Sequence, residues 1–80
     1  MEISAIREAL HRQSFRAFSL RLADGRALIV PHPDFVAVSP RRVIVINSQD
    51  ESHSVLEPLL IVSIDYAGDG QQTGQQQGTP

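Results

Sequence analysis

The fold is decided by residues 18–30, FSLRLADGRALIV. Apolar residues occupy every second position on either side of Asp24-Gly25. A period of two places alternate side chains on one face of a β-strand. Asp-Gly is a strong signal for a hairpin with a type I′ turn, in which both central residues have positive φ. The stretch therefore predicts two antiparallel strands, residues 16–23 and 26–31, joined at Asp24-Gly25.

Three more extended segments follow this hairpin. Pro31 and Pro33 each fix φ and lack a backbone donor, so they require a bend after the second strand. The next segments are predicted at residues 35–39, 43–47 and 53–66, the last interrupted at Pro58.

The segment Val43–Ile46 is apolar at all four positions. This pattern indicates a strand that is covered on both faces, or one that lies at a subunit contact.

The two ends of the chain differ in character. Residues 3–12 place Ile3, Ile6 and Leu10 at helical spacing, which predicts an amphipathic helix with Ser4 as a candidate N-cap. Residues 68–80 contain no apolar side chain to bury and are rich in Gln and Gly. We expect a disordered tail there and one small domain over residues 1–67.

These elements predict a mainly β (α+β) fold with an N-terminal helix followed by a five-stranded, strongly bent antiparallel sheet. Curled far enough, such a sheet closes into a small SH3-like or Sm-like barrel. The alternative is an open meander with the helix on one face. The bend at Pro31 and Pro33 favours the barrel.

The amino-acid composition argues against several kinds of functional site. The chain has 80 residues, no Cys and a net charge of −2, so neither a disulfide framework nor a thiolate metal site is available, and no overall field attracts nucleic acid. All seven basic residues are arginines. The N-terminus opens into a polar amphipathic segment, and no apolar run approaches the ~20 residues of a bilayer span. We therefore expect no signal peptide, no membrane contact and a cytoplasmic location.

Resemblance to a known family rests on three segments of the chain, Phe15–Phe18, Leu22–Arg26 and His32–Phe35. The chain is similar over about residues 3–66 to a family of short bacterial proteins. Their motifs are a leading helix, Phe-Arg-Pro-Phe, Asp-Gly-Arg, His-Pro-(Asp/Glu)-Phe and a closing Leu-Leu-Ile-(Val/Thr). This chain has Ala17 where that family usually has Pro. The family has no established activity, so the resemblance implies none.

The predicted topology also resembles the Sm-like fold, a helix followed by five bent strands. Sm-like proteins form rings by pairing edge strands, and many bind uridine-rich RNA. This chain lacks their Asp-x-x-x-Asn pattern and the glycine that bends their second strand, and Asn47–Ser52 replaces their Arg-Gly or Lys-x-His element. The resemblance therefore implies a topology and a ring, and RNA binding does not follow from it.

His32 and Asp34 are the strongest candidates for chemistry, because a carboxylate can orient an imidazole for base catalysis or metal binding. No third ligand is evident beside them, and joining them to His11 and His53 would need a coincidence of the fold. No Gly-x-Ser-x-Gly elbow and no Gly-rich phosphate loop are present. We predict no enzyme, no cofactor and no metal site.

Binding candidates are exposed cations and one aromatic residue. The arginines lie at two predicted turns, where they could contact phosphate or could simply discourage edge-to-edge aggregation. Phe35 follows the double-proline bend and is a candidate contact residue. The full set, with the histidine and aspartate above, is Arg21, Arg26, His32, Asp34, Phe35, Arg41 and Arg42.

The favoured function is a non-enzymatic module that self-associates or binds a protein partner through its strand edges and the Val43–Ile46 surface. Its partner is unknown, and a homo-oligomer fits this interpretation. The alternatives are an Sm-like RNA-binding ring and a small metal-dependent enzyme at His32 and Asp34.

Overall fold

The computed structural model describes residues 1–66, so the tail predicted at residues 68–80 lies outside the described residues. Helix α1 comes first, followed by six strands and two short 3₁₀ helices. The bounds are α1 Ile3–Leu10, β1 Phe18–Leu22, β2 Ala27–Val30, η1 Pro33–Phe35, β3 Val36–Ser39, β4 Arg42–Ile46, β5 His53–Leu56, η2 Pro58–Leu60 and β6 Ile61–Tyr66.

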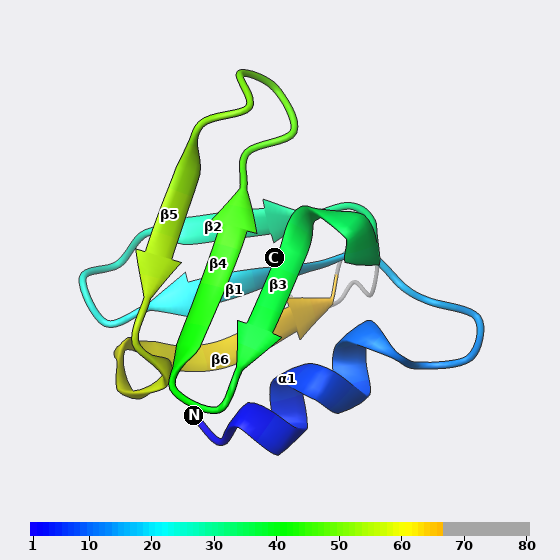
Figure 1. The fold of residues 1–80 in the computed structure, drawn as a ribbon, viewed down its shortest axis with the longest axis horizontal. Helices are drawn as coiled ribbons and strands as arrows, with labels where there is room; N and C mark the ends of the chain where they lie inside the picture. Colours follow the sequence, from blue (N-terminus) through cyan, green and yellow to red (C-terminus); the bar gives the residue numbers. More distant parts are fainter. Residues whose placement is uncertain (67–80) are drawn as a thin grey trace, which may run out of the picture.

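The strands form two three-stranded antiparallel sheets, with the orders β2-β1-β6 and β3-β4-β5. Figure 1 shows the strands of the second sheet crossing those of the first at a steep angle. The expectation of a small, mainly β domain with a leading helix is confirmed. The single five-stranded sheet is not found, because η1 separates β2 from β3 and η2 separates β5 from β6. Within residues 1–66, the two sheets are not closed into a barrel.

The β1–β2 hairpin is present, but its turn differs from the predicted type I′. Gly25 N–H donates to Leu22 C=O at 2.9 Å, and Leu22 N–H donates to Arg26 C=O at 2.8 Å. Gly25 has φ +93°, whereas Asp24 is not at positive φ. The loop is therefore a three-residue one, a turn followed by a left-handed glycine. The prediction of type I′ was wrong because Asp-Gly suits both loop lengths.

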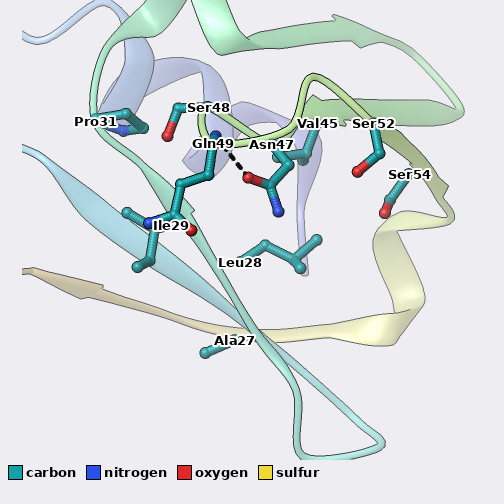
Figure 2. A pocket seen from close by; sticks show the side chains of 10 residues that line it. All are labelled: Ala27, Leu28, Ile29, Pro31, Val45, Asn47, Ser48, Gln49, Ser52 and Ser54. Atoms are coloured by element: carbon teal, nitrogen blue, oxygen red, sulfur yellow. Dashed lines mark hydrogen bonds between the residues drawn. The ribbon is translucent and has the colours of Figure 1, made fainter.

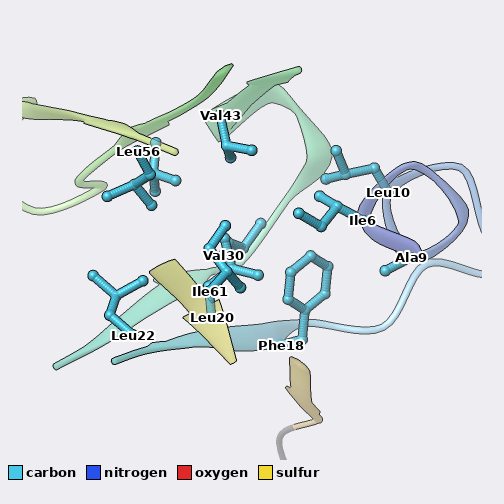
Figure 3. Packing of buried hydrophobic residues seen from close by; sticks show 11 residues of the cluster. Ile6, Ala9, Leu10, Phe18, Leu20, Leu22, Val30, Val43, Leu56 and Ile61 are labelled. Atoms are coloured by element: carbon cyan, nitrogen blue, oxygen red, sulfur yellow. The ribbon is translucent and has the colours of Figure 1, made fainter. Parts of the chain in front are cut away.

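The core lies between the two sheets, and α1 closes one end of it (Figure 3). The buried helix residues are Ile6, Ala9 and Leu10, as its apolar spacing requires. Phe18, 1% exposed, extends into the core from β1. The other buried residues are Leu20, Leu22, Val30, Val43, Val45, Leu56 and Ile61. The core is thus largely aliphatic.

Two local predictions need correction. Glu2, not Ser4, occupies the N-cap of α1, without a side-chain cap hydrogen bond, and the helix ends at Leu10. In β6 the register shifts, because Arg21 pairs with Ser63 whereas Leu22 pairs with Ile61. The extra residue, Val62, is a β-bulge, which interrupts the alternation of faces along β6.

Candidate functional site

A cleft of about 240 Å³ separates the open edge of β2 from the β4–β5 hairpin (Figure 2). All ten residues described as lining it are uncharged. From β2 and its end come Ala27, Leu28, Ile29 and Pro31; from the hairpin come Val45, Asn47, Ser48, Gln49, Ser52 and Ser54. An apolar wall on one side thus faces a wall rich in amide and hydroxyl groups on the other.

The β2 wall exposes main-chain groups to this cleft. In the β1–β2 ladder, Leu22 pairs with Arg26 through a hydrogen bond from Leu22 N–H to Arg26 C=O. Hydrogen-bonded and non-hydrogen-bonded pairs alternate along an antiparallel ladder. Leu28 therefore directs its N–H and C=O toward β1, whereas Ala27 and Ile29 direct theirs to the open edge. The Ile29 side chain is 64% exposed.

The opposite wall is held by hydrogen bonds within its own loop. Asn47 Oδ1 accepts from Gln49 N–H at 2.8 Å, and Asn47 C=O accepts from Glu51 N–H at 2.8 Å. Ser52 donates both its N–H and its hydroxyl to Asp50 Oδ1, at 3.0 and 2.7 Å. The bond from Ser52 N–H, followed by the one from its hydroxyl, lowers the pKa of Asp50 from the ordinary 3.8. The conformation of the loop is thus supported by hydrogen bonds among its own residues.

Glu51 has φ +61°, a left-handed conformation that is rare for a side-chain-bearing residue. It lets the chain turn back so that Asn47 N–H can donate to Ser52 C=O at 2.7 Å. This closes the hairpin directly above the cleft.

The predicted binding residues lie at three different places in Figure 1: the β1–β2 hairpin, the bend between β2 and β3, and the β3–β4 turn. In the first group, Arg21 Nε donates to Asp65 Oδ2 at 3.0 Å, and Arg26 Nε to Asp24 Oδ2 at 2.8 Å. The Arg26 N–H also donates to Asp24 Oδ1, and this bond is the main reason that the pKa of Asp24 lies below its ordinary value. Both cations are thus paired with carboxylates, one on β6 and one in the β1–β2 loop.

At the bend, His32 and Asp34 do come together. His32 Nδ1 accepts from Asp34 N–H at 3.1 Å and lies 3.5 Å from Asp34 Oδ2. The imidazole thereby caps the 3₁₀ helix η1, which also contains the half-buried Phe35. The arrangement gives this pair a structural role at the bend. Among residues 1–66, no three His, Cys, Asp or Glu side chains are grouped so that they could hold a metal ion.

The third group is Arg41 and Arg42, which lie at the β3–β4 turn. Arg42 donates from Nη1 to the C=O of Arg41 at 3.0 Å, and both residues are exposed.

One cluster of aromatic and basic side chains was not predicted from the sequence. The guanidinium carbons of Arg12 and Arg16 lie 5.5 and 5.0 Å from the centre of the Tyr66 ring, within cation–π range. Tyr66 also meets Phe18 edge to face. The cluster fastens the segment after α1 to the end of β6. Residues about 50 positions apart meet here, and no spacing in the sequence indicates this contact.

The outer face of the β3-β4-β5 sheet is apolar near its middle. Ala37, Ile44 and Val55 form one row across the three strands. Ile44 is 36% exposed and Val55 is 57% exposed. Of the two interpretations of Val43–Ile46, coverage on both faces does not hold within residues 1–66, because only Val43 and Val45 are buried.

The chain matches no protein-family model, no curated protein and no solved structure. In the part of the chain that the structure describes, no helix has the length and apolar character needed to span a bilayer.

Proposed function

We propose that this domain is a non-enzymatic interaction module that binds an extended, uncharged polypeptide segment along the open edge of β2. The observation that carries the proposal is the cleft itself, because one of its walls is a strand edge with outward main-chain groups at Ala27 and Ile29. A partner strand added there forms backbone hydrogen bonds on one side, and alternate side chains enter the cleft.

The cleft also indicates the chemistry of the partner. A volume of about 240 Å³ suits one or two side chains of a bound segment. Its polar wall is made of serine hydroxyls and the amides of Asn47 and Gln49, and a buried charge would have no counter-ion there. Ser, Thr, Asn or Gln side chains of the partner fit this wall, and aliphatic ones fit Leu28.

The proposed binding mode goes with an SH3-like arrangement of the two sheets. The sheets β2-β1-β6 and β3-β4-β5 follow one another across the η1 bend, and this order suits the two halves of an SH3-like barrel. In that arrangement the β4–β5 hairpin forms the rim above β2, which is where the cleft lies.

The test is peptide selection followed by a backbone variant. Random dodecapeptides displayed on phage are selected on the 80-residue protein and then measured by calorimetry. Ile29→Pro removes an outward N–H without removing a β1–β2 ladder bond. Loss of one such bond costs about 1 kcal/mol, or about five-fold in Kd. Val55→Pro is the matched control, because it makes the same change at the open edge of β5.

Peptides that bind the wild type and Val55→Pro equally, and Ile29→Pro more weakly, support the proposal. The peptide can be N-methylated at its odd-numbered or at its even-numbered residues. Only one of these two patterns should abolish binding, because only one edge of an added strand pairs with β2. Strand addition would be refuted by selected peptides that bind Ile29→Pro as tightly as wild type. It would also be refuted by peptides that still bind with either pattern of N-methylation.

A further inference from the structure

A second open edge lies on the other sheet, at β5, and it exposes a different set of groups. Asn47 N–H donates to Ser52 C=O at the end of the β4–β5 ladder. From this pair the alternation of an antiparallel ladder makes Val45–Ser54 and Val43–Leu56 hydrogen-bonded pairs. His53 and Val55 therefore direct their N–H and C=O away from β4.

Side chains on this edge place an imidazole and a carboxylate on either side of an apolar centre. Val55 is 57% exposed, and His53 and Glu57 are exposed two positions before and after it. Residues two apart in an extended chain share a face. Glu57 is extended, with φ −89° and ψ 138°, so the edge continues through it. The Val55 side chain adjoins Ile44, which prolongs the apolar surface across β4.

We infer that two copies of this chain pair antiparallel along β5, about a twofold axis at Val55, to form a continuous six-stranded sheet. In this register Val55 pairs with Val55 of the second copy, and each N–H donates to the other C=O. His53 lies opposite Glu57 of the second copy, twice, on the outer face. The interface does not use the β2 edge, and Ser54 is the cleft-lining residue of β5 that it includes, opposite Leu56 of the second copy.

Other registers conflict with the structure. An axis at His53 would oppose the two His53 side chains and would bring Glu51, at φ +61°, into the ladder. An axis at Glu57 would oppose two carboxylates and would require η2, which begins with Pro58. An axis at Ser54 would set His53 opposite Val55, and Glu57 opposite Glu51, of the second copy, which opposes two carboxylates and again brings the left-handed Glu51 into the ladder. The Val55 axis has none of these defects.

Sedimentation equilibrium of the 80-residue protein between about 1 µM and 1 mM gives the first test. We expect a monomer–dimer equilibrium for the wild type and for Ile29→Pro, and a monomer for Val55→Pro with an unchanged far-UV spectrum. Val55→Lys, which places two like charges at the axis, is the second disrupting variant. A wild type that stays monomeric throughout refutes the inference, and so does a dimer that survives both Val55 variants.

A charge exchange tests the register. His53→Glu replaces two imidazole–carboxylate pairs, which can form hydrogen bonds, by two pairs of opposed carboxylates, so the dimer Kd should rise about ten-fold. Adding Glu57→Lys should bring it back toward the wild-type value. A double variant no tighter than His53→Glu would refute this register.

A disulfide test locates the axis, because the chain has no cysteine of its own. In the proposed register the two Val55 Cα atoms are about 5.5 Å apart, within disulfide range. Mild oxidation of Val55→Cys should therefore give a cross-linked dimer. Ile44→Cys is the control, since three strand spacings separate the two copies, about 14 Å. Equal cross-linking of both variants would show random collision and would overturn the inference.

Discussion

Gly25→Val should destabilise the domain through the backbone alone. Gly25 has φ +93°, and a Cβ built there meets no atom within 4 Å. A β-branched residue at such a φ costs about 2–3 kcal/mol. The smaller conformational entropy of the unfolded chain offsets up to about 1 kcal/mol of this. The net loss of about 1–3 kcal/mol should lower Tm by about 4–24 °C in a domain of this size.

The decisive comparison is with the mirror-image side chain. D-Alanine is unstrained at φ +93° and also restricts the unfolded chain, so Gly25→D-Ala should stabilise by about 0.4–1 kcal/mol. Ala23→Val is the control within the same turn, at a residue that is exposed and not at positive φ. Thermal unfolding followed by circular dichroism measures all three. If Gly25→Val leaves Tm unchanged, or if Val and D-Ala shift it in the same direction, the description of the turn is wrong.

Three more perturbations have defined outcomes. Glu51→Gly relieves the left-handed strain at φ +61° and should raise Tm by about 2–4 °C; a lower Tm would contradict that strain. The pKa of Asp50 is lowered chiefly by Ser52 N–H, so its contribution to stability is present above the unfolded pKa of 3.8 and is lost as pH falls through the folded value. The difference in unfolding free energy between wild type and Asp50→Asn should therefore shrink in acid, and a difference constant with pH would contradict this. Removing residues 68–80 should leave Tm within about 2 °C, because this segment has no large apolar side chain that could join the core; loss of the cooperative transition would show that it belongs to the fold.

The hairpin could be predicted because two local signals agree there. Alternating apolar residues fixed which side chains are buried, and Asp24-Gly25 marked the reversal. The turn type could not be predicted in the same way. A two-residue loop would pair Ala23 with Arg26, whereas the observed loop pairs Leu22 with Arg26. The observed register sets Leu20 opposite Leu28, so both enter the core from the same face.

The pattern of apolar residues at the start of β6 does not indicate which side chains are buried. Leu59, Leu60, Ile61 and Val62 are all apolar, so alternation cannot say which of them is buried. The structure buries Ile61 and leaves the other three at least half exposed. The bulge at Val62 then restores the phase for Ile64. A single-sequence argument lacks the tertiary contacts that make this choice.

The arginines predicted as binding residues form ion pairs or hydrogen bonds with residues of this chain. The open strand edges could be predicted only in part. Arg21 and Arg26 each form an ion pair with an aspartate, which the residue types alone do not predict. That the domain would have several strand edges could be predicted from the number of short strands. Which edges are open depends on how the two sheets stack, and the cleft at β2 exists only because the distant β4–β5 loop lies above it.

The two open edges can be separated by a reciprocal pair of proline variants. Ile29 and Val55 are both exposed residues on edge strands, and at each the N–H is directed away from the neighbouring strand. Proline at either position removes one outward donor and leaves the native ladder intact. Ile29→Pro should therefore weaken peptide binding and leave dimerisation unchanged, and Val55→Pro should do the reverse. If each variant impaired both activities, the edges would be coupled through the fold, and neither assignment to a single edge would stand.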